Sequence, residues 1–108
     1  MEPLLEKVAW RRRGSRSEFF GALRAADDGI RLTGRDPSSG LDVELSIPAG
    51  ELAGVHVSRN ERAPRDPIVV LELDAEPILL RNPGAGPLYA QLLSRKLGAL
   101  VRTGSRAG

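Results

Sequence analysis

The sequence contains no cysteine, which excludes disulfides, thiolate metal ligands and cysteine nucleophiles. Histidine occurs once, at His56, whereas a zinc site normally draws on several histidine or cysteine ligands. We therefore expect no metal centre and no cofactor. In a strand, His56 falls on the face opposite Val55 and Val57, which predicts a surface histidine.

Aromatic residues and long apolar runs are also scarce. The four aromatic residues are Trp10, Phe19, Phe20 and Tyr89, so the core must be built mainly from aliphatic side chains. No apolar run approaches the ~20 residues that a membrane-spanning helix requires. The N-terminus lacks the basic and then apolar layout of an export signal, and we expect a cytoplasmic protein.

Lysine is rare too, although the chain is basic. The 108 residues carry a formal net charge of +2, and every cationic residue other than Lys7 and Lys96 is arginine. This usage is common in proteins from GC-rich bacterial genomes, so we expect a bacterial source. The length fits one domain.

Period-two alternation dominates the middle of the chain and predicts about six short antiparallel strands. They cover residues 18–25, 30–35, 41–47, 53–59, 68–74 and 78–81. In the most regular of these strands, alternation directs Leu41, Val43, Leu45 and Ile47 inward. Alternation also directs Ala53 inward with Val55 and Val57. Turns are expected at 26–29 and 36–40, where Asp, Pro, Ser and Gly gather.

The ends of the chain are less regular. Residues 1–16 are interpreted as an N-terminal arm, in which Leu4, Leu5 and Val8 have helix-like spacing. Residues 8–13 would also suit a further strand. Residues 17–102 then form the domain, and the Gly-, Ser- and Arg-containing residues 103–108 are expected to be a disordered tail.

The stretch RNPGAGPLYAQLLSRKLGALV, residues 81–101, resembles the strand, Gly-x-Gly turn and helix that begin many nucleotide sites. However, Tyr89 occupies the third glycine position of the dinucleotide fingerprint, and no Lys-Ser/Thr pair closes a phosphate loop. We therefore interpret Gly84 and Gly86 as turn residues before a helix that covers an open end or face of the sheet. The apolar stripe of that helix comprises Leu88, Tyr89, Leu92, Leu93, Leu97, Leu100 and Val101.

A run of antiparallel strands closed by one amphipathic helix resembles the pleckstrin-homology-like (PH-like) superfold, which includes GRAM domains. The resemblance rests on ALRAADDGIRLTG (22–34), LSIPAGELAGVHV (45–57) and IVVLELDAEPILLRN (68–82). These look like a first hairpin, a strand that bends at a proline and restarts, and a last hairpin before the helix. The resemblance implies a mainly β fold, an antiparallel barrel or bent sheet of six to seven strands closed by one C-terminal α-helix.

The resemblance also implies a non-catalytic interaction module, and we expect its partner to be a protein segment. An exposed strand edge or the groove beside the helix would accept such a segment by strand addition, and an unpaired edge would also permit a homodimer. In the lipid-binding members, basic residues flank the first hairpin loop. We expect that loop at 26–29, where Asp27 and Asp28 oppose phosphate binding, although Arg24 and Arg31 flank them.

The alternative hypothesis is a peripheral membrane module that contacts anionic lipid. Its contact residues would be Trp10, Arg11, Arg12, Arg13 and Arg16. Nucleic-acid binding usually requires a broader basic face with stacking aromatic residues, and no nucleic acid is expected.

The acidic residues and serines do not favour an enzyme. Asp42 and Glu44 share one strand face, as do Glu72 and Asp74, and alternation predicts that both faces are solvated. The serines lack the context of a nucleophile elbow. We therefore expect no catalytic activity.

Overall fold

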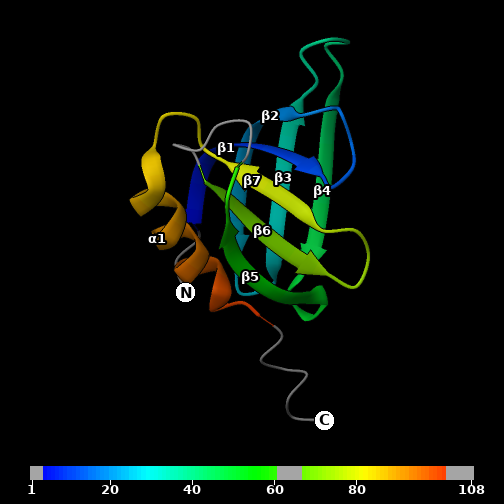
Figure 1. Cartoon of the computed structure of the whole chain (residues 1–108). Coiled ribbons are helices and arrows are strands. Elements are labelled where there is room, and N and C mark those ends of the chain that lie inside the picture. The colour runs from blue at the N-terminus through cyan, green and yellow to red at the C-terminus, as the bar shows by residue number, and fades with distance from the viewer. Residues whose placement is uncertain (1–3, 61–66, 102–108) are drawn as a thin grey trace.

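The computed structural model describes residues 4–60 and 67–101, which form seven antiparallel strands, one short 3-10 helix and one α-helix (Figure 1). The strands are β1 (Leu4–Arg12), β2 (Phe19–Ala26), β3 (Gly29–Arg35), β4 (Asp42–Pro48), β5 (Leu52–Ser58), β6 (Ile68–Leu73) and β7 (Ile78–Arg81). The helices are η1 (Ala49–Glu51), which joins β4 to β5, and α1 (Gly86–Gly98).

All seven strands belong to one sheet with the order β4-β3-β2-β1-β7-β6-β5. Strand β1 is central: it pairs with β2 from Leu4 to Trp10 and with β7 from Ala9 to Arg12. The sheet is not closed but bent, so that β2–β4 stand at the back of Figure 1 and β5–β7 cross in front of them. The bent antiparallel sheet with its C-terminal helix confirms the predicted PH-like fold class.

Of the two interpretations of the N-terminal arm, the helix-like one is wrong and the further strand at residues 8–13 is confirmed in part, because residues 4–12 form the central strand. Inside that strand Val8 and Trp10 are buried in the core, with Leu4 packed against it, in the period of two that a strand produces. A nine-residue helix would be marginal by itself, whereas β1 has backbone partners on both sides. Residues 4–12 therefore belong to the same sheet as β2–β7. The predicted tail, 103–108, lies outside the described residues.

The core lies between the two halves of the bent sheet and is mainly aliphatic, as expected. Helix α1 contacts β5 and β6 and contributes Ala90, Leu93 and Leu97 to the core, so its predicted covering role is confirmed. The predicted stripe is too wide, because Leu88 and Leu92 are 68% and 46% exposed. Leu88 precedes Leu97 by about two and a half turns, which places it on the opposite side of the helix.

Three further inward positions were predicted wrongly, and one of them, Val57 on the terminal strand β5, is 37% exposed. Leu41 is 66% exposed and precedes β4, in the β3–β4 hairpin that projects beyond the body of the protein at the top of Figure 1. Ala53 is exposed because the β5–β6 register shifts between Leu52 and Gly54. Such a bulge breaks the period of two, so the core receives Leu52 and Val55 instead.

The bend of the sheet is occupied by the indole of Trp10, which is 1% exposed. Its Nε1–H donates a hydrogen bond to the carbonyl oxygen of Thr33 at 3.0 Å, and its ring centroid lies 4.8 Å from that of Phe19. A Cβ atom at Gly34 would lie 2.8 Å from the Phe19 Cβ and 3.0 Å from the Trp10 Nε1. Glycine at position 34 therefore provides the space that the indole fills.

We expect Gly34→Ala to lower the free energy of unfolding by about 1–3 kcal/mol, because the added methyl group displaces the packed rings. Urea denaturation followed by the fluorescence of Trp10, the only tryptophan, measures this change. Gly50→Ala is the matched control, because a Cβ atom there meets no heavy atom within 4 Å. Equal stability of the two variants would contradict the proposed role of Gly34.

Candidate functional site

The structure separates the five residues that the sequence groups as an anionic contact site. Trp10 is buried, so the prediction that its side chain contacts a membrane is wrong; the alternation of β1 directs it into the core. Arg12, Arg13 and Arg16 are exposed, and Arg11 is half-buried. Only Arg11 and Arg16 of this set line a common hollow.

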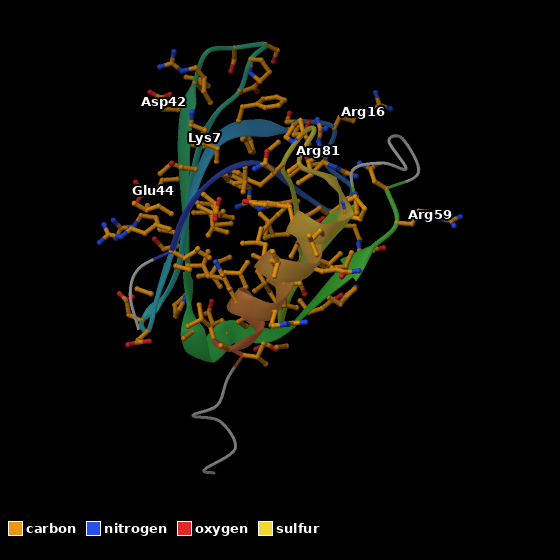
Figure 2. The ribbon with its side chains drawn as sticks, turned by 90° about the vertical axis from the view of Figure 1, so that its left-hand side faces the viewer. Lys7, Arg16, Asp42, Glu44, Arg59 and Arg81 are labelled. Atoms are coloured by element: carbon orange, nitrogen blue, oxygen red, sulfur yellow. The ribbon has the colours of Figure 1, made fainter. Side chains whose placement is uncertain are left out.

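That hollow, which we call the arginine pocket, has a volume of about 330 Å³. Its walls include Arg11 of β1, Arg16 and Glu18 of the β1–β2 loop, and Arg81 of β7. Arg16 and Arg81 lie near the same end of the molecule in Figure 2. The guanidinium of Arg11 donates through Nη1 to the carbonyl oxygen of Ser15 at 3.3 Å, which connects the strand to the loop.

A bidentate ion pair between Arg81 and Glu18 forms one wall of the arginine pocket. The Nε and Nη2 atoms of Arg81 each lie 2.7 Å from a carboxylate oxygen of Glu18. Both side chains are about three-quarters buried, with exposures of 25% and 24%. This geometry holds two planar groups rigidly, and Glu18 offsets the charge of Arg81. The positive surplus of the pocket therefore comes from Arg11 and Arg16.

The floor of the arginine pocket is apolar, which sequence reasoning missed. Leu79 lines the pocket, and its direct cross-strand partner Val70 is also buried, although neither belongs to the core cluster. The second half of the sheet is thus buried on both faces. The signal was present in the unbroken apolar runs 68–71 and 78–80, which are typical of strands buried on both sides.

The first hairpin loop lies elsewhere than the sequence predicted. Because β1 precedes the expected first strand, the first loop of the sheet is formed by residues 13–18, and residues 27–28 form the second. Arg11, Arg12, Arg13 and Arg16 therefore lie in or next to the first loop. The objection to anion binding based on Asp27 and Asp28 does not apply to this loop.

The two terminal strands of the sheet differ in charge. Strand β4 carries Asp42, which pairs with Arg35 at 2.9 Å, and Glu44, which pairs with Arg31 at 3.3 Å. Strand β5, with the sequence LAGVHVS, carries no Asp, Glu, Lys or Arg. Charged side chains and proline commonly protect sheet edges from pairing with other chains. By that criterion β4, which ends in a proline, is protected and β5 is not.

His56 is a surface residue, as predicted. Its side chain is 51% exposed, and its Nδ1 lies 3.8 Å from the Glu72 Oε1. In residues 4–60 and 67–101, no three His, Asp or Glu side chains are grouped so that they could hold a metal ion. Asp42 and Glu44 are exposed, and the hydrogen bond from Arg35 lowers the pKa of Asp42. That pKa shift keeps the carboxylate ionised, which does not suit a general acid.

A polar contact at the edge of the core joins α1 to β1. The Tyr89 hydroxyl donates to the Glu6 carboxylate at 2.9 Å, and both residues are half-buried. Burial raises the pKa of the Tyr89 hydroxyl, and the neighbouring Glu6 carboxylate raises it further, whereas a hydrogen bond with Asn82 lowers it. Sequence patterns do not predict this pairing, because the two residues are 83 positions apart.

No family model matches the sequence, and no curated protein matches it either. Within the described part of the chain, no helix has the length and apolar character needed to cross a membrane. The function must therefore be inferred from the geometry of the sheet, its edges and its hollows.

We expect Glu6→Gln to lower the pKa of Tyr89. The variant removes a carboxylate that accepts a hydrogen bond from the phenol and repels the tyrosinate anion. Tyr89 is the only tyrosine, so the near-ultraviolet absorbance of tyrosinate reports on it alone. The raised pKa in the folded state means that the wild type should lose stability as the pH rises through the titration of Tyr89. Tyr89→Phe is the control and should lack this loss; a titration unchanged in Glu6→Gln would contradict the pairing.

Proposed function

We propose that the protein is a non-catalytic interaction module that binds an extended segment of another protein along the free edge of β5. The observation that carries this proposal is the absence of charged residues from β5, a terminal strand of the sheet. Main-chain hydrogen bonds would supply affinity for the segment, and contacts with alternate side chains would supply selectivity. The resemblance to PH-like domains supports a binding role, and we retain the bacterial cytoplasm as the expected location.

The part of β5 beyond its bulge is best suited to strand addition. His56, Val57 and Ser58 are exposed, and they pair on their other side with Val70, Val69 and Ile68 of β6. A segment added there would therefore continue a regular antiparallel sheet. Val57 is 37% exposed and lies on the same strand face as Val55, so an apolar side chain of the segment would extend that packing.

We expect Val57→Lys to weaken binding of a β5-directed peptide roughly tenfold, through loss of apolar contact and gain of an edge charge. The probe is a peptide selected against the wild-type protein from a displayed library of extended sequences. Its binding should slow hydrogen exchange at the backbone amides of residues 54–58, as measured by NMR. Ser46→Lys, on the other terminal strand, is the matched control and should bind normally.

Two outcomes of this experiment would redirect the proposal. Perturbation of β4 or α1 without any change in β5 would contradict binding at the β5 edge. A concentration-dependent dimer that Val57→Lys abolishes would identify a second copy of the chain as the occupant, in place of another protein.

A second candidate function is contact with an anionic lipid headgroup through the arginine pocket. It is favoured by the position of Arg11 and Arg16 beside the first hairpin loop, where the resemblance places basic residues in lipid-binding members. Leu79 in the same pocket supplies an apolar surface. In this proposal the arginine pocket replaces Trp10 as the membrane contact.

We expect Arg11→Gln/Arg16→Gln to reduce binding to phosphatidylserine vesicles roughly thirtyfold at low salt, at about 1 kcal/mol for each lost cation. Co-sedimentation with vesicles measures the effect, and added salt should weaken binding of the wild type. Arg95→Gln, an exposed position on α1, serves as the control. If the wild type does not bind these vesicles at low salt, this candidate is wrong.

A further inference from the structure

The face of β1–β4 that points away from the core, which we call the outer face, carries two arginines close enough to repel each other. Arg24 of β2 and Arg31 of β3 are direct cross-strand partners, which places their Cβ atoms about 4.5–5.5 Å apart. Like charges in this relation destabilise a sheet. Glu44 pairs with Arg31 at 3.3 Å, but within residues 4–60 and 67–101 the side chain of Arg24 makes no hydrogen bond or ion pair.

Both arginines line a hollow of about 390 Å³, which we call the Arg24–Arg31 hollow. Ser46 of β4, the direct cross-strand partner of Arg31, also lines it. The short side chain of Ala26 leaves space between the arginines and the β2–β3 turn, where Asp28 forms part of the wall. A volume of this size is in the range of small-molecule sites.

We propose that the Arg24–Arg31 hollow binds the carboxylate group of a small organic anion. The carboxylate bridges the two guanidinium groups, whose planar forks of N–H donors match its geometry. The Ser46 hydroxyl supplies a further donor on the same wall. The bound anion offsets the repulsion between the arginines and gives Arg24 a partner.

The charges of the hollow favour a singly charged carboxylate over a phosphate dianion. Arg24 and Arg31 contribute two positive charges to the lining and Asp28 contributes one negative charge, which leaves a surplus of one. The Glu44 carboxylate, paired with Arg31, also offsets part of the positive charge of that arginine. A second negative charge on the ligand would therefore lie near carboxylates without a compensating cation.

This site is distinct from those in the proposed function. The outer face to which it belongs also carries Lys7 and Glu44, which project to the left in Figure 2, whereas Arg16 and Arg59 project to the right. The inference does not depend on strand addition at β5 or on lipid contact at the arginine pocket. Failure of either of those proposals would leave it intact, and the reverse also holds.

The test is an NMR titration of the arginine side-chain Nε–Hε signals with propionate near neutral pH. Inorganic phosphate and chloride at equal ionic strength are the comparison anions. We expect saturable shifts of the Arg24 and Arg31 signals with propionate, weaker binding of phosphate, and no saturation with chloride. Arg24→Gln and Arg31→Gln should each weaken propionate binding about tenfold or more.

The matched control is Arg12→Gln, an exposed arginine outside the hollow, which should leave propionate binding unchanged. Thermal unfolding supplies an independent readout, because propionate should raise the melting temperature of the wild type but not of Arg24→Gln. Asp28→Asn should strengthen phosphate binding selectively. The absence of saturable shifts, unchanged binding in Arg24→Gln, or tighter binding of phosphate than of propionate to the wild type would overturn the proposal.

Discussion

The bend of the sheet depends on the packing of one indole ring. The first part of β1 pairs with β2 and its last part pairs with β7. The Trp10 side chain packs inside the bent sheet where these two pairings overlap, in contact with the Thr33 carbonyl and the Phe19 ring. Gly34 leaves the space that the ring needs. The sheet does not close into a complete barrel, so β4 and β5 remain its two terminal strands.

The two halves of the sheet present different chemistry to solvent. The outer face of β1–β4 carries exposed arginines and carboxylates, several of them paired across strands. On the corresponding face of β6 and β7, Val70 and Leu79 are buried, and the Glu18–Arg81 pair borders the pocket that Leu79 lines. The two surfaces that we propose for a protein segment and for a small anion therefore lie on chemically different parts of one sheet.

Local alternation and turn chemistry were sufficient to predict the six strands from β2 to β7 and the C-terminal helix, and the PH-like resemblance implied the fold class. They failed where a distant partner decides the outcome. Residues 4–12 form a strand because β2 and β7 pair with them, and Ala53 turns outward because β5 contains a bulge. The arginine pocket joins residues from three separated segments, so only Arg11 and Arg16 of its wall were anticipated, while its Glu18–Arg81 pair was not.

The central position of β1 has a consequence for how the chain acquires its structure. Ala9 pairs with Arg81, a separation of 81 − 9 = 72 residues. Contacts so remote in sequence are slow to form, because a long loop must close before they stabilise the chain. As the polypeptide leaves the ribosome, β1 can join β2 early, but the hydrogen-bonding groups at its other edge stay without their partners until β7 emerges. The nascent chain is therefore most vulnerable to aggregation during that interval.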